Sequence, residues 1–77
     1  MDVASIEATL RAAIADCELE IQSEGNKLGL RIVSDAFEGL SRVKRQQKVY
    51  AALDDRIKSG EIHAVSMVTL TRSEATD

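Results

Sequence analysis

Three kinds of side chain in this sequence have chemistry suited to binding a metal ion or nucleic acid. The chain has one histidine, His63, one cysteine, Cys17, and a dense group of cations between residues 42 and 48. An imidazole or a thiolate can ligate a metal ion, and clustered cations can neutralise phosphates. No nucleophile, base and orienting group stand together in the sequence, so we do not expect an enzyme.

His63 follows the glycine Gly60 by three residues, where a stretch rich in β-branched residues predicts the start of a strand. An imidazole at a strand end can still reach solvent, where it is free to bind a metal ion. The same residue is also explained as a strand-end side chain that hydrogen-bonds to the backbone or to water. From the residues alone, the second interpretation is favoured.

Cys17 continues the apolar side of a helix that the spacing predicts from Val3 onward. It has no CxxC partner and no flanking cation, so a small buried hydrophobe is favoured over a metal ligand or redox thiol. One cysteine cannot form an internal disulfide, and we see no signal peptide and no apolar run of membrane length. We therefore expect a reducing, cytoplasmic compartment and no membrane partner.

The cations belong to a segment, residues 41–58, whose apolar residues recur at helical spacing. On a helical wheel the predicted apolar stripe lies opposite most of the cations. The stripe consists of Val43, Tyr50, Leu53 and Ile57, with Val49 on its edge, and the four cations are Arg42, Lys44, Arg45 and Lys48. We expect Phe37 and Tyr50, the only aromatic residues, to pack in the core, which leaves no stacking platform for bases.

The clearest local pattern lies on either side of Gly25-Asn26. Apolar and polar residues alternate before and after this pair, which is typical of two strands joined by a hairpin. Glycine at the first central position favours a type II′ two-residue turn. The predicted partners are Leu19 with Ile32 and Ile21 with Leu30 on an apolar face, and Glu20 with Arg31 and Glu24 with Lys27 on a solvent face.

The other segments complete one small α+β domain over residues 1–77. We expect a short helical turn near Phe37, a strand over residues 62–70, and a capping box at Thr71 that opens a tail, residues 72–77, which frays. Apolar residues on both faces of the strand at 62–70 predict an inner strand, or one whose outer face meets a partner. The expected architecture is a three-stranded mixed sheet with helices on one face, in the order α-β-β-α-α-β-α.

Three segments together resemble the signature of the BolA-like family. They are the turn Phe37-Glu38-Gly39, the helix SRVKRQQKVY and the strand HAVSM, in that order and spacing. The sequence Lys44-Arg45-Gln46-Gln47 looks most like that of the short bacterial branch of this family. The resemblance implies a fold similar to a class II KH domain and a non-enzymatic adaptor or regulator, a monomer or weak homodimer when alone.

The resemblance also implies a metal site shared with a partner. In this family the histidine at the position of His63 is a ligand to a [2Fe–2S] cluster held jointly with a monothiol glutaredoxin and glutathione. The implied docking surface includes Gly60, Ile62 and His63. Many members carry a further cysteine or histidine ligand in the hairpin loop, whereas here Lys27 stands near that position. The missing ligand would be replaced by Cys17, by a partner group, or by nothing.

A second function is implied by the same resemblance. In the family the basic helix and the turn before it are implicated in DNA binding and transcriptional control during stress, acid stress included, and in cell morphology. Arg42, Lys44, Arg45 and Lys48 would then contact phosphates. Against this, the net charge is −3 and no GxxG loop is present. A solvated helix face also explains the cations.

Overall fold

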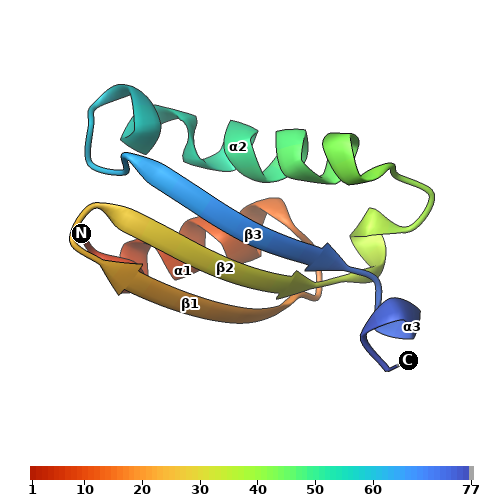
Figure 1. Ribbon diagram of the computed structural model, residues 1–77. Helices are drawn as coiled ribbons and strands as arrows, with labels where there is room; N and C mark the ends of the chain where they lie inside the picture. Colours follow the sequence, from red (N-terminus) through yellow and green to blue (C-terminus); the bar gives the residue numbers. More distant parts are fainter. Residues whose placement is uncertain (77) are drawn as a thin grey trace.

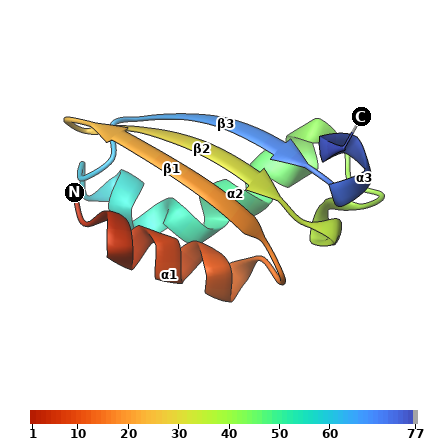
Figure 2. The ribbon, with the colours of Figure 1, turned by 90° about the horizontal axis from the view of Figure 1, so that it is seen from below.

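The computed structural model describes residues 1–76 and confirms the predicted three-stranded mixed sheet. Figure 1 shows β2 between β1 and β3, and Figure 2 shows α1 and α2 together on one face of the sheet. The element order also agrees with the prediction. The elements are α1 (Val3–Ala13), β1 (Glu18–Glu24), β2 (Lys27–Val33), the 3₁₀ helix η1 (Asp35–Phe37), α2 (Arg42–Lys58), β3 (Ala64–Leu70) and α3 (Arg72–Ala75).

The β1–β2 hairpin has the predicted register at all four pairs, including Leu19 with Ile32 and Glu20 with Arg31. Gly25 has a φ of +60°, whereas Asn26 is not among the residues with positive φ, a combination that fits a type II′ turn. The period of two places the apolar residues of both strands on the face that the helices cover. The opposite face, called the open face below, carries the charged residues of β1 and β2 and meets solvent.

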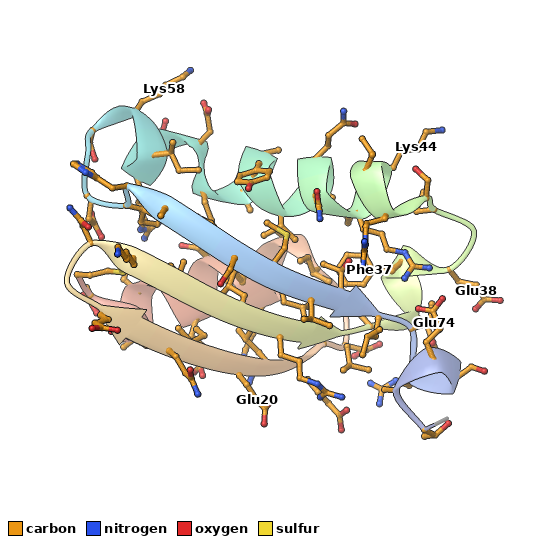
Figure 3. The ribbon with its side chains drawn as sticks, viewed as in Figure 1. Glu20, Phe37, Glu38, Lys44, Lys58 and Glu74 are labelled. Carbon is orange, nitrogen blue, oxygen red and sulfur yellow. The ribbon has the colours of Figure 1, made fainter. Side chains whose placement is uncertain are left out.

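The core lies between the sheet and the two long helices. α1 contributes Ile6 and Leu10, and Asp2 caps this helix by accepting a hydrogen bond from the Ser5 N–H at 3.1 Å. Phe37 is completely buried, as predicted, beside the start of α2 (Figure 3). Cys17 is also buried, which confirms its interpretation as a small hydrophobe of the core.

The buried side of α2 is rotated from the predicted stripe. Val49 and Leu53 are fully buried, whereas Val43 is 61% exposed and Tyr50 is 41% exposed. The prediction that Tyr50 packs in the core was therefore wrong. The physical reason is that the long side chains of two arginines and the small Ala52 occupy the inward side of the helix, so the apolar period alone misjudges its orientation.

β3 lies at the edge of the sheet, parallel to β2, so the prediction of an inner strand was wrong. β2 is central because the hairpin pairs one of its sides with β1 and the α2 crossover brings β3 to the other side. That the outer side of β3 meets a partner stays a prediction. The strand begins at Ala64 rather than Ile62, since the pairing with β2 begins where Ala64 lies opposite Lys27. Ile62 comes before this pairing and packs in the core, with 1% of its surface exposed.

The segment after β3 forms the short helix α3. The predicted capping box at Thr71 is present: the Thr71 side chain accepts from the Glu74 N–H, and the Glu74 carboxylate accepts from the Thr71 N–H. We expected residues 72–77 to fray; residues 72–75 are helical here, residue 77 lies outside the described residues, and fraying itself stays a prediction. Within residues 1–76 no helix is long and apolar enough to cross a membrane.

Candidate functional site

His63 lies beside the hairpin turn, although the two are far apart in the sequence. Its backbone N–H donates a hydrogen bond to the Asn26 carbonyl oxygen at 2.8 Å, and the next residue, Ala64, pairs with Lys27. The side chain of His63 is exposed. The start of β3 and the hairpin turn therefore form one end of the molecule, and the imidazole is accessible there.

Gly60 lies next to this imidazole and has no side chain that could cover it. It has a φ of +84°, in the left-handed region that ends many helices, and its N–H donates to the Ile57 carbonyl oxygen at 3.2 Å. A side chain at this position would begin 3.6 Å from Nε2 of His63. Glycine is therefore suited to the turn after α2, and it also leaves this side of the imidazole uncovered.

Ile62 does not belong to the exposed surface that the sequence predicted for docking. Its side chain is 1% exposed, and its N–H donates to the Arg56 carbonyl oxygen at 3.2 Å. Its apolar side chain is buried before the strand begins, which corrects its assignment as a contact residue. Its role is to hold the segment between Gly60 and His63 against the core.

The two other positions considered as ligands differ in their distance from His63. Lys27 is close, since it pairs with Ala64, but a protonated amine has no lone pair for a metal ion. Cys17 precedes β1 at the opposite end of the sheet, where Glu18 pairs with Val33. Seven strand residues separate the two ends, roughly 20 Å, so the structure does not bring Cys17 and His63 together.

Three of the four predicted phosphate contacts lie on the exposed surface of α2. Arg42, Lys44 and Lys48 are exposed, and none forms an ion pair with another residue in the range 1–76. Figure 3 shows Lys44 projecting away from the sheet. Ser41 caps the start of this helix, because its hydroxyl accepts from the Lys44 N–H at 3.2 Å. These three cations are free to meet an anionic partner.

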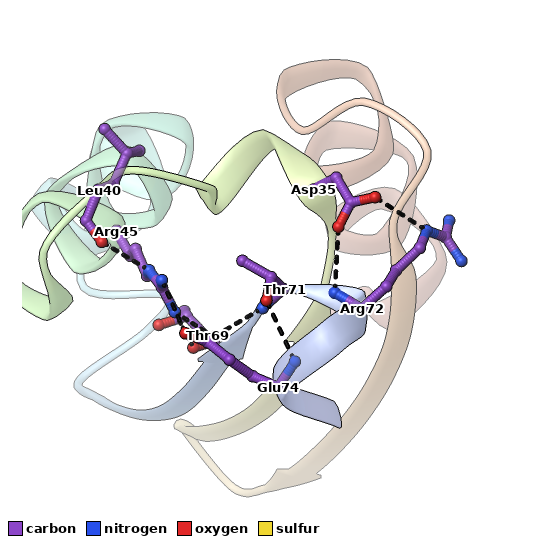
Figure 4. Close-up of polar contacts among 7 residues, drawn as sticks. All are labelled: Asp35, Leu40, Arg45, Thr69, Thr71, Arg72 and Glu74. Carbon is purple, nitrogen blue, oxygen red and sulfur yellow. Dashed lines mark hydrogen bonds and ion pairs between the residues drawn. The ribbon is translucent and has the colours of Figure 1, made fainter. Parts of the chain in front are cut away.

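Arg45 is different, and its assignment as a phosphate contact needs correction. Only 13% of its side-chain surface is exposed, and its guanidinium donates to the carbonyl oxygens of Leu40 at 2.9 Å and Thr69 at 3.1 Å (Figure 4). It also lies over the Phe37 ring, 5.9 Å from the centroid. Its donors serve the fold rather than a partner.

The guanidinium of Arg45 also binds the carboxylate of Glu74, a partner that sequence reasoning missed. The contacts are 2.7 Å to Oε1 and 3.2 Å to Oε2. Hydrogen bonds from Arg45 and from the Thr71 N–H lower the pKa of Glu74 from 4.5 to about 2. The capping box at Thr71 was the one sequence signal that Glu74 is structurally important, and it gave no indication of the arginine.

The sequence and the fold both have close counterparts among known proteins. Residues 9–74 match the family model described as BolA-like protein. A protein from an rpoN-murA intergenic region of Acinetobacter guillouiae is 46% identical over 65 residues, covering 84% of this chain and 78% of that protein. The acid stress protein IbaG of Escherichia coli is 35% identical over 74 residues, covering 96% of this chain and 88% of IbaG.

A solved structure supports the same similarity. The BolA domain of SufE1 from Arabidopsis thaliana superposes with a TM-score of 0.85 at 38% identity, covering 92% of each chain. The superposition therefore extends over nearly the whole chain.

Proposed function

Because this chain belongs to the BolA-like family, we propose that it is a non-enzymatic adaptor that docks on a monothiol glutaredoxin and shares a [2Fe–2S] cluster with it. The observation that carries the proposal is the exposed imidazole of His63 beside a glycine that leaves Nε2 uncovered. A relative named for acid stress supports a role in stress response. We place this role in cytoplasmic iron–sulfur cluster handling.

The residues present suit a shared cluster better than a resident one. Such a cluster needs four protein or thiol ligands, and this end of the molecule offers the single imidazole of His63. The glutaredoxin cysteine and a glutathione thiol would supply further ligands. When bound, the cluster would supply one-electron redox chemistry and a transferable iron–sulfur unit.

Two features of this chain act at the His63 end: a backbone hydrogen bond that fixes the position of His63, and the positive charge of Lys27. The hydrogen bond from the His63 N–H to Asn26 fixes the start of β3 against the hairpin turn, so the imidazole is held at a defined edge. Lys27 brings an ammonium group to the same end. Its positive charge would favour a partner that carries thiolates, even though it cannot act as a ligand.

The test is assembly of the complex from this protein, a monothiol glutaredoxin, iron, sulfide and glutathione, followed by visible circular dichroism. We expect a heterodimer spectrum that His63→Ala abolishes or shifts and that Cys17→Ala, at the other end of the sheet, leaves unchanged. Lys27→His should make the cluster more resistant to chelators by adding a second imidazole. An identical spectrum for wild type and His63→Ala would overturn the proposal.

DNA binding is the second candidate, and it is supported by the three exposed cations at the start of α2. If these cations contact phosphates, the affinity for DNA should fall steeply as the salt concentration rises. In a plot of log affinity against log salt concentration, the slope should be shallower by about 3 for the triple variant Arg42→Gln, Lys44→Gln, Lys48→Gln than for the wild type. Arg45 is excluded from this set by its contacts. Binding that is absent at low salt, or insensitive to salt, would remove this candidate.

A further inference from the structure

The open face of the sheet has a glycine at its centre that the backbone does not require. Gly29 lies in the middle of β2 with ordinary extended φ, and a side chain added there would meet Ser66 Oγ at 3.7 Å and Gln22 Cβ at 3.9 Å, which are normal contacts. Glycine weakens a strand interior and is common where a ligand approaches the backbone closely. The absence of a side chain at this position therefore points to a role for the open face of the sheet.

A hollow lies over Gly29, called the Gly29 hollow below. Two adjoining cavities of about 550 Å³ and 250 Å³ share Gln22, Gly29 and Ser66 in their lining. Gln22 on β1 and Ser66 on β3 are the register partners of Gly29, so they form the walls on either side of β2. The amide and the hydroxyl both offer hydrogen bonds to a molecule lying along the strand.

Charges of both signs close the two ends of the hollow. Lys27 and Arg31 lie two residues before and after Gly29 on the same face of β2. Each faces an acidic partner on β1: Lys27 pairs in register with Glu24, and Arg31 pairs with Glu20, whose carboxylate is 3.9 Å away. The two ends are about 13 Å apart, the length of four strand residues.

We propose that the Gly29 hollow binds a short zwitterionic peptide of three or four residues. Its carboxylate would be held by the cation at one end, its ammonium by the carboxylate at the other, and its amides by Gln22 and Ser66. The acidic pair of β1 disfavours a purely anionic ligand, and the cations of β2 disfavour a purely cationic one. This proposal does not rest on the cluster or on DNA, although Lys27 lies both at one end of the hollow and at the end of the molecule that carries His63.

The probe is trialanine with both ends free, compared with its N-acetylated and C-amidated forms, titrated into the ¹⁵N-labelled protein and followed by amide NMR shifts. Trialanine should move the resonances of Gln22, Gly29 and Ser66, and each blocked form should bind at least about 5-fold more weakly. Equal shifts from all three forms would show that charge does not select the ligand and would overturn the proposal.

Variants inside and outside the Gly29 hollow test whether trialanine binds there. Gly29→Val fills the hollow with a β-branched side chain that favours a strand, so the melting temperature should rise while trialanine binding falls about 10-fold or more. The melting temperature and the trialanine affinity of Gly29→Ala should lie between those of the wild type and Gly29→Val. His63→Ala, outside the hollow, should bind trialanine as the wild type does. Undiminished binding by Gly29→Val, with its amide spectrum showing a folded protein, would contradict the proposal.

Discussion

The Arg45 guanidinium and the Glu74 carboxylate form a two-point ion pair that joins the first turns of α2 and α3 across 29 residues of sequence. The same Oε1 atom accepts the Thr71 N–H at 2.9 Å, so one carboxylate caps α3 and holds it to α2. A second contact, from the Arg72 N–H to Asp35 at 3.1 Å, ties α3 to η1. The short helix therefore depends on tertiary partners more than on its own length.

The ion pair predicts a pH-dependent contribution to stability. The pKa of Glu74 is lowered from 4.5 to about 2 in the folded protein, so the contribution is complete above 4.5 and is lost as the pH falls toward about 2. Glu74→Gln should lower the melting temperature at neutral pH, and the difference from the wild type should shrink over this range. Thermal unfolding followed by circular dichroism measures it.

Glu7→Gln is the matched control, since its exposed ion pair with Arg11 is 3.8 Å long. It should change the melting temperature little at any pH. A difference between Glu74→Gln and wild type that stays constant down to the lowest pH would show that the carboxylate acts through its shape rather than its charge.

The two aromatic residues should differ sharply in their contribution to stability. Phe37 is fully buried beneath Arg45, so Phe37→Ala should cost about 3–5 kcal/mol in the free energy of unfolding. Tyr50 is 41% exposed, so Tyr50→Ala should cost about 1 kcal/mol or less. Urea denaturation gives both values. Equal losses would mean that α2 turns Tyr50 inward in solution.

The sequence predicted local features better than orientations. The hairpin register followed from a period of two and a glycine turn, because a slip by one residue would expose the apolar face. The buried side of α2 could not be predicted in the same way. Two arginines pack the apolar stems of their side chains inward, and a pattern of apolar residues does not reveal this. Similarly, Ile62 reads as a strand residue in sequence, and only the packing of the segment after Gly60 shows that it belongs to the core.

The candidate site was predictable from the sequence only in part. The position of His63 at the start of a strand followed from Gly60 and the β-branched run, but its proximity to Asn26 depends on the parallel pairing of β2 with β3. The same pairing explains why Cys17 lies at the far end of the sheet. The order of the elements predicted a mixed sheet, but residue spacing carries no signal for which strand β3 pairs with or which residues lie opposite one another.

Glycine at position 60 should matter for two separable reasons, which Gly39 helps to distinguish. Both have positive φ, +84° and +79°, so alanine at either should cost about 1 kcal/mol in stability. Only the side chain at position 60 would lie near His63 Nε2, whereas nothing lies within 4 Å at position 39. Gly60→Ala should therefore shift the imidazole NMR resonances of His63, and Gly39→Ala should leave them unchanged. Equal shifts in both variants would show that the effect is a general loss of stability.

The reactivity of Cys17 separates a thiol of the core from a thiol that can serve as a ligand. The side chain is 8% exposed, and the turn beside it is held by a hydrogen bond from Arg11 Nη1 to the Cys17 carbonyl oxygen at 2.9 Å. An alkylating reagent needs an accessible thiolate, so modification of the native protein should be about 100-fold slower than that of the urea-unfolded chain. The rate should rise with denaturant as the protein opens. A native rate equal to the unfolded rate would mean that this end of the sheet opens readily, and Cys17 would then return as a candidate ligand despite its distance from His63.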